Sequence, residues 1–288
     1  MSKMKLPSRM ALILNGAAIL IGGASLVMVL RPVFGGNEMP PCAERYPSAT
    51  RLGLDRDGEP LTTADLQSRV GNSDWGILSG ARVVKLRSGP AKHALELDLA
   101  SAPPATPKPV GDDKVGLGFA WTPQSMGRSR AACLAYSVFV PEGFTFGKGG
   151  RLPGLAGTSG LASDGSEAVF STRYTWGPGG EADIHTHLPD WPEGRSIFNE
   201  GSGFGLEPGK WVALEQEVVL NTPGKKDGII RVWRDGRLAL QKTDVVFRTK
   251  AAVLISSVMA ESVAGEQLPS TKPGPQKIWL TPFELRWQ

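Results

Sequence analysis

The sequence has little that would suit a helical or a nucleic-acid-binding protein. Its 288 residues include 36 glycines and 23 prolines, which disfavour helix interiors, and no long stretch follows a helical period. Its formal net charge of +4 comes from four residues before position 32, because the other 28 basic residues are matched by 28 acidic ones. Phosphate binding needs a clustered basic surface. We therefore expect no nucleic-acid partner and a loop-rich β protein.

Cysteine is also scarce, with Cys42 and Cys133 the only two in the chain. An even pair forms a disulfide readily in an oxidising compartment, and this one would tie an N-terminal segment to a later strand. Two separate buried thiols are the alternative.

One long apolar run stands out between Met10 and Leu30, and it is interrupted only by Asn15, Ser25 and glycines. As a helix it would reach about 31 Å, which matches a bilayer's hydrocarbon core. The basic residues before it should stay in the cytoplasm, so the rest of the chain is exported. Residues 1–36 are therefore a membrane anchor or a long signal sequence. We expect a periplasmic or extracellular domain, anchored to the inner membrane by residues 10–30.

The remaining chain divides into a tether and a domain. Residues 37–78 have little periodicity and read as the tether, with one short helical stretch at Thr63–Arg69 capped by Thr62 or Thr63. Residues 79–288 alternate strand patterns with turn signals, which predicts an all-β protein, a jelly-roll β-sandwich. The predicted strands are Ala81–Leu86, His93–Leu99, Ala131–Val140, Glu167–Trp176, Glu181–Leu188, Trp211–Leu220, Gly228–Trp233, Leu238–Phe247, Ala252–Met259 and Lys277–Arg286.

Two junctions carry hairpin signals. Trp-Gly-Pro-Gly-Gly occupies positions 176–180, and Arg-Asp-Gly-Arg occupies positions 234–237. Asp-Gly suits the tight turns that match the twist of paired strands. Each junction should join two antiparallel neighbours.

The first of these hairpins gathers ionisable residues on one face. Successive side chains of a strand alternate between faces, so Ser171 and Arg173 lie opposite the face that carries Tyr174. On the partner strand His185 and His187 share a face with Asp183. If the apolar faces of both strands pack into the core, the serine, the arginine and both histidines lie together on the opposite face.

Three interpretations fit this cluster. It can be a solvated strand face with no function. Asp183, His185 and His187 can bind a metal, although Arg173 would repel a cation and no further ligand is evident. The third is acid and base catalysis on an acidic sugar, since a guanidinium pairs with a carboxylate and an imidazole moves protons near neutral pH.

Three stretches resemble a known family, the polysaccharide lyase family 14 enzymes. They are AYSVFVPEGFTFGKGGRLPGLAG at 135–157, FSTRYTW with GGEADIHTHLP between 170 and 189, and GKWVALEQEVVLNTPGKKDGIIRVWRDG at 209–236. The resemblance covers about residues 130–248, and more weakly 79–285. It implies a jelly-roll sandwich that cleaves alginate or related polyuronates.

The resemblance also implies site residues. Ser171 and Arg173 match the family's serine and arginine. Arg151 stands at the position of a lysine, and His185 and His187 stand where a pair of tyrosines is expected. Lys148 is the nearest amine that can replace the lysine. Tyr174 cannot replace the tyrosines, because alternation turns it into the core.

The altered residues still permit β-elimination. This reaction needs a base at C5, a cation for the C6 carboxylate and an acid for O4. A free imidazole, with a pKa of about 6.5, is a better base near neutral pH than an ordinary tyrosine. Arginine is almost never a base, so Arg151 and Arg173 would hold the carboxylate and the histidines would move the protons.

Other candidates have plainer explanations. Glu215 and Glu217 resemble a hydrolase carboxylate pair, but an exposed strand face explains them more simply. Trp191, Trp211 and Trp233 can stack on sugars, although core packing is the more frequent use. His93 stands alone.

The sequence therefore indicates a polysaccharide lyase that acts on an acidic, uronate-containing polysaccharide and needs no cofactor and no metal. The alternative is a non-catalytic glycan-binding or envelope-scaffolding module on the same fold. A hydrolase or a metal-dependent enzyme is a further possibility.

Overall fold

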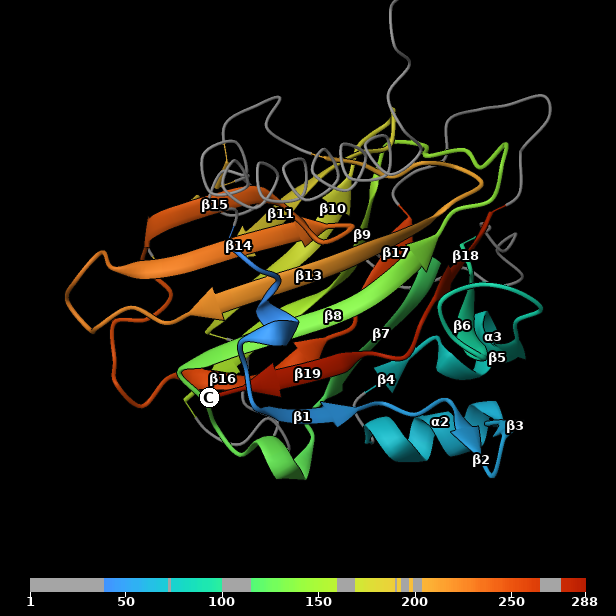
Figure 1. Cartoon of the computed structure of the whole chain (residues 1–288), viewed down its shortest axis with the longest axis horizontal. Helices are drawn as coiled ribbons and strands as arrows, with labels where there is room; N and C mark the ends of the chain where they lie inside the picture. Colours follow the sequence, from blue (N-terminus) through green and yellow to red (C-terminus); the bar gives the residue numbers. More distant parts are fainter. Residues whose placement is uncertain are drawn as a thin grey trace, which may run out of the picture. The chain divides into compact units, whose positions relative to one another are not determined.

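The computed structural model describes residues 39–71, 74–99, 115–159, 169–189, 191–192, 197–198, 204–264 and 276–288. Pro40–Gln288 form one compact unit, in which two antiparallel sheets pack face to face (Figure 1). This confirms the all-β sandwich. The apolar run at residues 10–30 lies outside the described residues. Among the helices that are described, none has the length and apolar character needed to span a membrane.

The first sheet, here called the β8 sheet, has nine strands. In spatial order its main path is β15 (Arg237–Val245), β14 (Gly228–Arg234), β13 (Trp211–Val219), β8 (Ala131–Phe139), β18 (Lys277–Leu280), β6 (His93–Asp98) and β5 (Ala81–Lys85). Two further strands extend it, because β19 (Glu284–Trp287) pairs with β8 and β1 (Ser48–Arg51) pairs with β19.

The second sheet, the β10 sheet, has eight strands. Its path is β12 (Phe204–Gly205), β11 (Glu181–His187), β10 (Phe170–Trp176), β9 (Gly150–Thr158), β16 (Leu254–Met259), β7 (Val115–Trp121) and β17 (Ser262–Ala264), with β4 (Asp74–Trp75) paired to β7. Smaller elements are the hairpin of β2 (Asp55–Arg56) and β3 (Glu59–Pro60), the helices α2 (Thr63–Val70) and α3 (Ile77–Gly80), and the 3₁₀ turns η1 (Cys42–Glu44) and η2 (Gln124–Met126).

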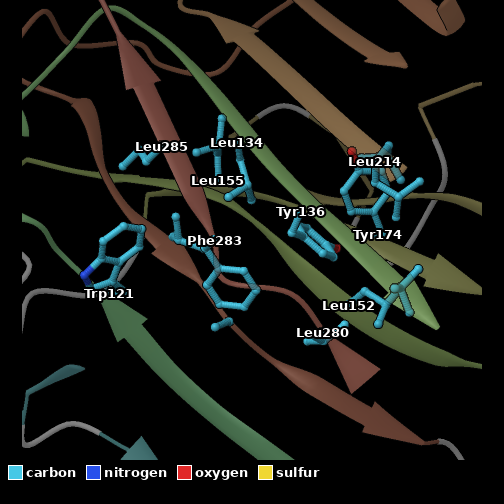
Figure 2. Packing of buried hydrophobic residues seen from close by; sticks show 14 of the residues in the cluster. Trp121, Leu134, Tyr136, Leu152, Leu155, Tyr174, Leu214, Leu280, Phe283 and Leu285 are labelled. Carbon is cyan, nitrogen blue, oxygen red and sulfur yellow. The ribbon is translucent and has the colours of Figure 1, made fainter. Parts of the chain in front are cut away.

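The core lies between the two sheets and is built from the apolar face of each strand. Tyr136 from β8 meets Tyr174 from β10 edge to face, with ring centroids 6.0 Å apart (Figure 2). Phe283 packs on the other side of Tyr136, 5.4 Å away. These contacts join the two layers at the level of the predicted hairpin.

Both predicted hairpins form. Asp235 and Gly236 have φ of 50° and 77°, the left-handed values that a tight primed turn needs. The Trp176–Glu181 junction closes with a backbone hydrogen bond from Gly177 N to Glu181 O of 2.8 Å.

The strand prediction fails where Pro and Gly interrupt the pattern. β9 was not predicted, because its Pro153 and Gly154 read as strand breakers. The predicted strand Lys277–Arg286 is two strands, β18 and β19, with Pro282 in the gap between them. The strands β1, β7, β12 and β17 were also missed, and most of them are short.

The segment predicted as a tether differs most from the structure. Its described part belongs to the same compact unit as the sandwich. The predicted helix is present as α2, and Thr62 and Asp65 form a capping box at its start. Leu66 and Val70, one helical turn apart, point into the core. The segment is made of short elements, each of which contributes only one or two residues to the core, so no long periodic pattern shows in the sequence.

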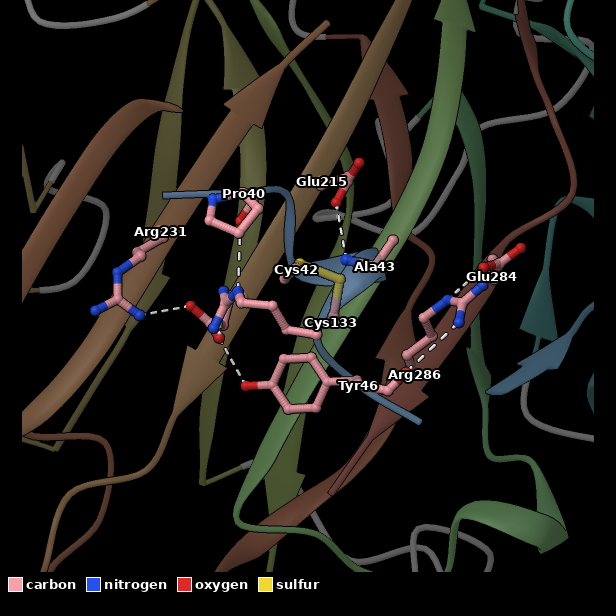
Figure 3. The surroundings of a disulfide bond; sticks show 11 residues. Pro40, Cys42, Ala43, Tyr46, Cys133, Glu215, Arg231, Glu284 and Arg286 are labelled. Carbon is pink, nitrogen blue, oxygen red and sulfur yellow. Dashed lines mark hydrogen bonds and ion pairs between the residues drawn. A yellow bond between two sulfur atoms is a disulfide. The ribbon is translucent and has the colours of Figure 1, made fainter. Parts of the chain in front are cut away.

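A disulfide between Cys42 and Cys133 fastens the start of this segment to β8 (Figure 3). It places η1 over the outer face of the β8 sheet, where Ala43 N donates a 3.1 Å hydrogen bond to Glu215. Burial raises the pKa of Glu215. The disulfide therefore holds residues 42–46 over strand β13. These residues are called the cover below.

The cover also buries Glu217, which is fully inaccessible to solvent. Its carboxylate accepts a 2.7 Å hydrogen bond from Tyr46 and pairs with Arg45 at 2.8 Å and Arg231 at 2.6 Å. The Arg45 guanidinium lies 5.5 Å from the centre of the Trp233 ring. Glu215 and Glu217 are thus beneath the N-terminal segment, and the prediction of an exposed strand face is wrong for them.

Removing the disulfide should destabilise the domain. Replacing both cysteines, as Cys42→Ser with Cys133→Ser, should lower the free energy of unfolding by up to about 4 kcal/mol, because the bond closes a long loop in the unfolded chain. Urea denaturation measures the change. An unchanged midpoint would mean that the cover is held by its other contacts alone.

Stability should also fall in acid through Glu217. Burial alone would raise its pKa, but the hydrogen bonds from Arg45, Tyr46 and Arg231 outweigh burial, so the pKa is lowered in the folded protein. Its contribution is complete above the carboxyl's unfolded pKa of about 4.3 and is lost as pH falls through the lowered folded value. Glu217→Gln should cost about 3 kcal/mol at pH 7 and should flatten the loss of stability toward acid.

Denaturation at pH 7 and at acidic pH tests this, with Glu59→Gln on the exposed strand β3 as the control. A Glu217→Gln protein that loses stability in acid as steeply as the wild type would contradict it.

Candidate functional site

The predicted cluster lies on the β10–β11 hairpin. In the antiparallel register Ser171 is the partner of His187, and Arg173 is the partner of His185. Cross-strand partners share a face of the sheet. The intervening Tyr174 points into the core and is fully buried. The structure therefore brings four of the predicted residues together on the outer face of the β10 sheet.

The four side chains differ in how far solvent reaches them. Ser171 is 2% exposed, and the Arg173 side chain is 12% exposed. His185 is half-buried and His187 is exposed. His187 is therefore the most exposed of the four, and Ser171 is the least exposed.

Arg151 joins the same face from β9. Its partner across the sheet is Thr175, which shares a face with Arg173. Its side chain is 33% exposed, so it lies nearer the surface than Arg173. Lys148 is exposed in the turn before β9, outside the strand positions that form this face.

Sequence reasoning missed Glu261, which lies between β16 and β17. Its carboxylate forms an ion pair with Arg173, and the same oxygen, Oε2, lies 3.4 Å from Nη1 of Arg151. Glu261 is 6% exposed. It stands far along the chain from both arginines and belongs to no motif, so only the pairing of β17 with β9 reveals it.

The backbone at Arg173 is irregular. Between the pairs Thr172–Leu155 and Tyr174–Leu152 the register shifts, so Arg173 faces both Pro153 and Gly154. This two-against-one arrangement is a β-bulge, which re-aims side chains and is frequent beside functional sites. A side chain at position 154 would collide with the Thr172 carbonyl. The bulge therefore explains both strand breakers in β9.

A buried glutamine of the opposite sheet supports the bulge from behind. Gln216 on β13 accepts hydrogen bonds from Leu155 N at 3.0 Å and from Thr172 Oγ1 at 2.9 Å. It also donates to Thr172 O at 2.7 Å. Tyr136 donates a 3.0 Å hydrogen bond to the carbonyl of Pro153. Polar groups that the irregular pairing would leave unsatisfied are thus hydrogen-bonded within the core.

The buried tyrosines are unsuited to proton transfer. Burial raises the pKa of Tyr136 and of Tyr174 well above the ordinary tyrosine value. Tyr174, which is buried in the core, therefore cannot stand in for a catalytic tyrosine on the outer face.

The geometry does not favour the metal interpretation. Within the described parts of the chain, the one group of potential ligands that converges is Cys42, Cys133 and Glu215. Its cysteines are joined in the disulfide, so they offer no thiolate. Asp183, His185 and His187 do not converge to ligand distances there.

The remaining candidates lie away from the cluster. Trp233 is fully buried, and Trp211 packs on Phe139 with ring centroids 5.4 Å apart. Trp191 is 37% exposed. His93 is buried in the β8 sheet, with Nδ1 4.0 Å from Asp55.

Comparison with known families agrees with this arrangement. The family model described as polysaccharide lyase 14 matches residues 100–271, which is more than half of the chain. The chain belongs to polysaccharide lyase family 14. The matched range contains the hairpin, β9 and Glu261. No curated protein sequence matches the chain.

Solved structures show the same fold at low sequence identity. A family 14 alginate lyase from Aplysia kurodai is 21% identical with a TM-score of 0.61, covering 84% of this chain and 99% of its own. An alginate lyase from a Chlorella virus is 24% identical with a TM-score of 0.54, covering 72% and 89%. A glucuronan lyase from the fungus Trichoderma reesei is 11% identical with a TM-score of 0.51, covering 76% and 90%.

Gln216 should matter for the stability of this family 14 protein. Gln216→Leu would remove the side-chain acceptor of the Leu155 amide and the side-chain donor to the Thr172 carbonyl, at about 1–3 kcal/mol for each unsatisfied group, while the Thr172 hydroxyl keeps its bond to Leu155 O. The matched control is Gln241→Leu, since Gln241 is exposed on β15 and accepts a hydrogen bond from Arg231. Urea denaturation should show a large loss for the first variant and little for the second. Equal losses would mean that the buried network adds nothing.

Proposed function

We propose that this protein is an exported polysaccharide lyase that cleaves a uronate-containing polysaccharide by β-elimination. The observation that supports this best is the pairing of Arg173 with His185 beside Ser171 and His187 on one sheet face. A cation and a base are thereby placed next to each other, which is what the reaction requires.

The arginines bind and stabilise the substrate's carboxylate. Removal of the C5 proton sends negative charge onto the C6 carboxylate, and a guanidinium holds such a group through two parallel hydrogen bonds. Arg173 is nearly buried, where charge interactions are stronger than in water. Arg151 adds a second cation nearer the surface.

The histidines move the protons. One neutral imidazole accepts the C5 proton as the C–H electrons form the C4=C5 double bond and the bond from C4 to O4 breaks. A protonated imidazole then supplies a proton to O4 of the departing chain. His185 lies beside Arg173 and is suited to the first step, and the more exposed His187 is suited to the second.

An acidic polysaccharide is the substrate class that the comparisons support. The structural neighbours include lyases named for alginate and for glucuronan, both polyuronates. Two arginines on the site face suit a chain that carries a carboxylate on each sugar.

Export is part of the proposal. A disulfide is typical of proteins outside the cytoplasm, and the structure joins Cys42 to Cys133. The apolar run at residues 10–30 would carry the domain across the inner membrane and anchor it there, which places it in the periplasm or outside the cell.

The decisive experiment measures the ultraviolet absorbance of the unsaturated uronate, which elimination forms and hydrolysis does not. His185→Ala and His187→Ala should each reduce turnover about 100-fold or more while sparing binding. Arg173→Ala should weaken both binding and turnover, because a charge-assisted hydrogen bond contributes about 1.5–3 kcal/mol. His93→Gln, on the other sheet, is the control and should keep full activity.

Two results would contradict the proposal. Full lyase activity in both alanine variants of the hairpin histidines would remove them from the mechanism. A wild-type protein that binds polyuronates and never forms the unsaturated product would be a glycan-binding module on a lyase fold.

A further inference from the structure

Arg151 and Arg173 are two cations on one face of the β10 sheet, and like charges repel. Glu261 lies between them. Its Oε2 contacts Nη1 of both guanidinium groups. One buried carboxylate oxygen therefore bridges the two residues that the proposed function assigns to the substrate's carboxylate.

The backbone fixes Glu261 in this place. Two residues before it, Met259 pairs with Gly154 at the bulge, and two residues after it, Val263 pairs with Arg151. The neighbouring Ala260 exchanges backbone hydrogen bonds with Phe119 of β7. Glu261 is thus held between the two strand positions that border the arginines, and its carboxylate does not depend on a mobile loop.

The bridged cluster is cationic. Its two guanidiniums and one carboxylate have a formal net charge of +1. A uronate carboxylate carries the opposite charge, so it is attracted to this cluster and can accept hydrogen bonds from guanidinium N–H groups.

We propose that Glu261 is a positioning residue, which holds Arg151 and Arg173 side by side so that together they bind one uronate carboxylate. The inference rests on the proposed function. The alternative is that Glu261 occupies the place of the substrate's carboxylate and competes with the substrate for the two arginines.

The test compares Glu261→Gln with the wild-type full chain, using alginate for turnover and an alginate trisaccharide for binding. The amide keeps the shape of the side chain but carries no negative charge to offset the repulsion between the two guanidiniums. KM and the trisaccharide Kd should each rise about 10-fold or more, as expected for a lost charged interaction, and kcat should fall as well, because the same arginines stabilise the charge that develops during elimination.

Two controls separate positioning from general stability. Glu207→Gln removes another carboxylate that pairs with a lysine and an arginine, in the turn before β13, and should leave KM and Kd unchanged. In an Arg151→Gln background there is no second cation to hold, so adding Glu261→Gln should change Kd by less than about 3-fold.

The outcomes distinguish the two proposals. A wild-type protein that binds the trisaccharide without cleaving it would overturn the lyase, yet a higher Kd in Glu261→Gln would still support positioning. A lower KM or Kd in Glu261→Gln would overturn positioning in favour of competition. Positioning would also be overturned, leaving a structural role alone, if Glu261→Gln lowered the melting temperature but left KM and Kd unchanged. Fully additive effects of Glu261→Gln and Arg151→Gln would lead to the same conclusion. A wild type that neither binds nor cleaves would overturn both proposals.

Discussion

The site depends on a set of hydrogen bonds that crosses the sandwich. Gln216 and Tyr136 belong to the β8 sheet, but they bond to Thr172, Leu155 and Pro153 around the bulge in the β10 sheet. Such polar groups are costly to bury unless each is paired. Because they are paired, the sheet keeps the irregular step at which Arg173 lies. The functional face is therefore determined partly by residues on its far side.

Two buried carboxylates organise arginines on opposite faces of the molecule. Glu217 is fully buried under the N-terminal segment, where Arg45, Arg231 and Tyr46 meet its two oxygens. Glu261 meets Arg151 and Arg173 through one oxygen at a face that solvent partly reaches. Both clusters thus hold two guanidiniums around one carboxylate, with one arginine of each nearly buried and the other about one-third exposed. They differ in their neighbours, because Tyr46 also bonds to Glu217, whereas Arg173 is the cross-strand partner of His185.

Features that depend on neighbouring residues could be predicted from the sequence, whereas features that depend on contacts between distant segments could not. Strand alternation is local, so the shared face of Ser171, Arg173, His185 and His187 could be predicted from the hairpin alone. The bulge, the cover over β13 and the position of Glu261 depend on pairings between distant segments, and no local pattern records them. Pro153 misled the prediction because a proline in a central strand is tolerated at a bulge, which the sequence does not display.

On the interpretation that Arg151, His185 and His187 replace the family's lysine and tyrosines, these residues form a consistent set with Glu261. A lysine at position 151 would offer a compact ammonium, whereas Arg151 offers a planar group that can contact Glu261 and a substrate carboxylate with different N–H donors. Unlike a lysine, an arginine at this position cannot exchange a proton. In the proposed mechanism the proton transfers therefore come from the two imidazoles on β11. Arg151 would then supply charge while His185 and His187 move protons, and Glu261 would keep the two cations together.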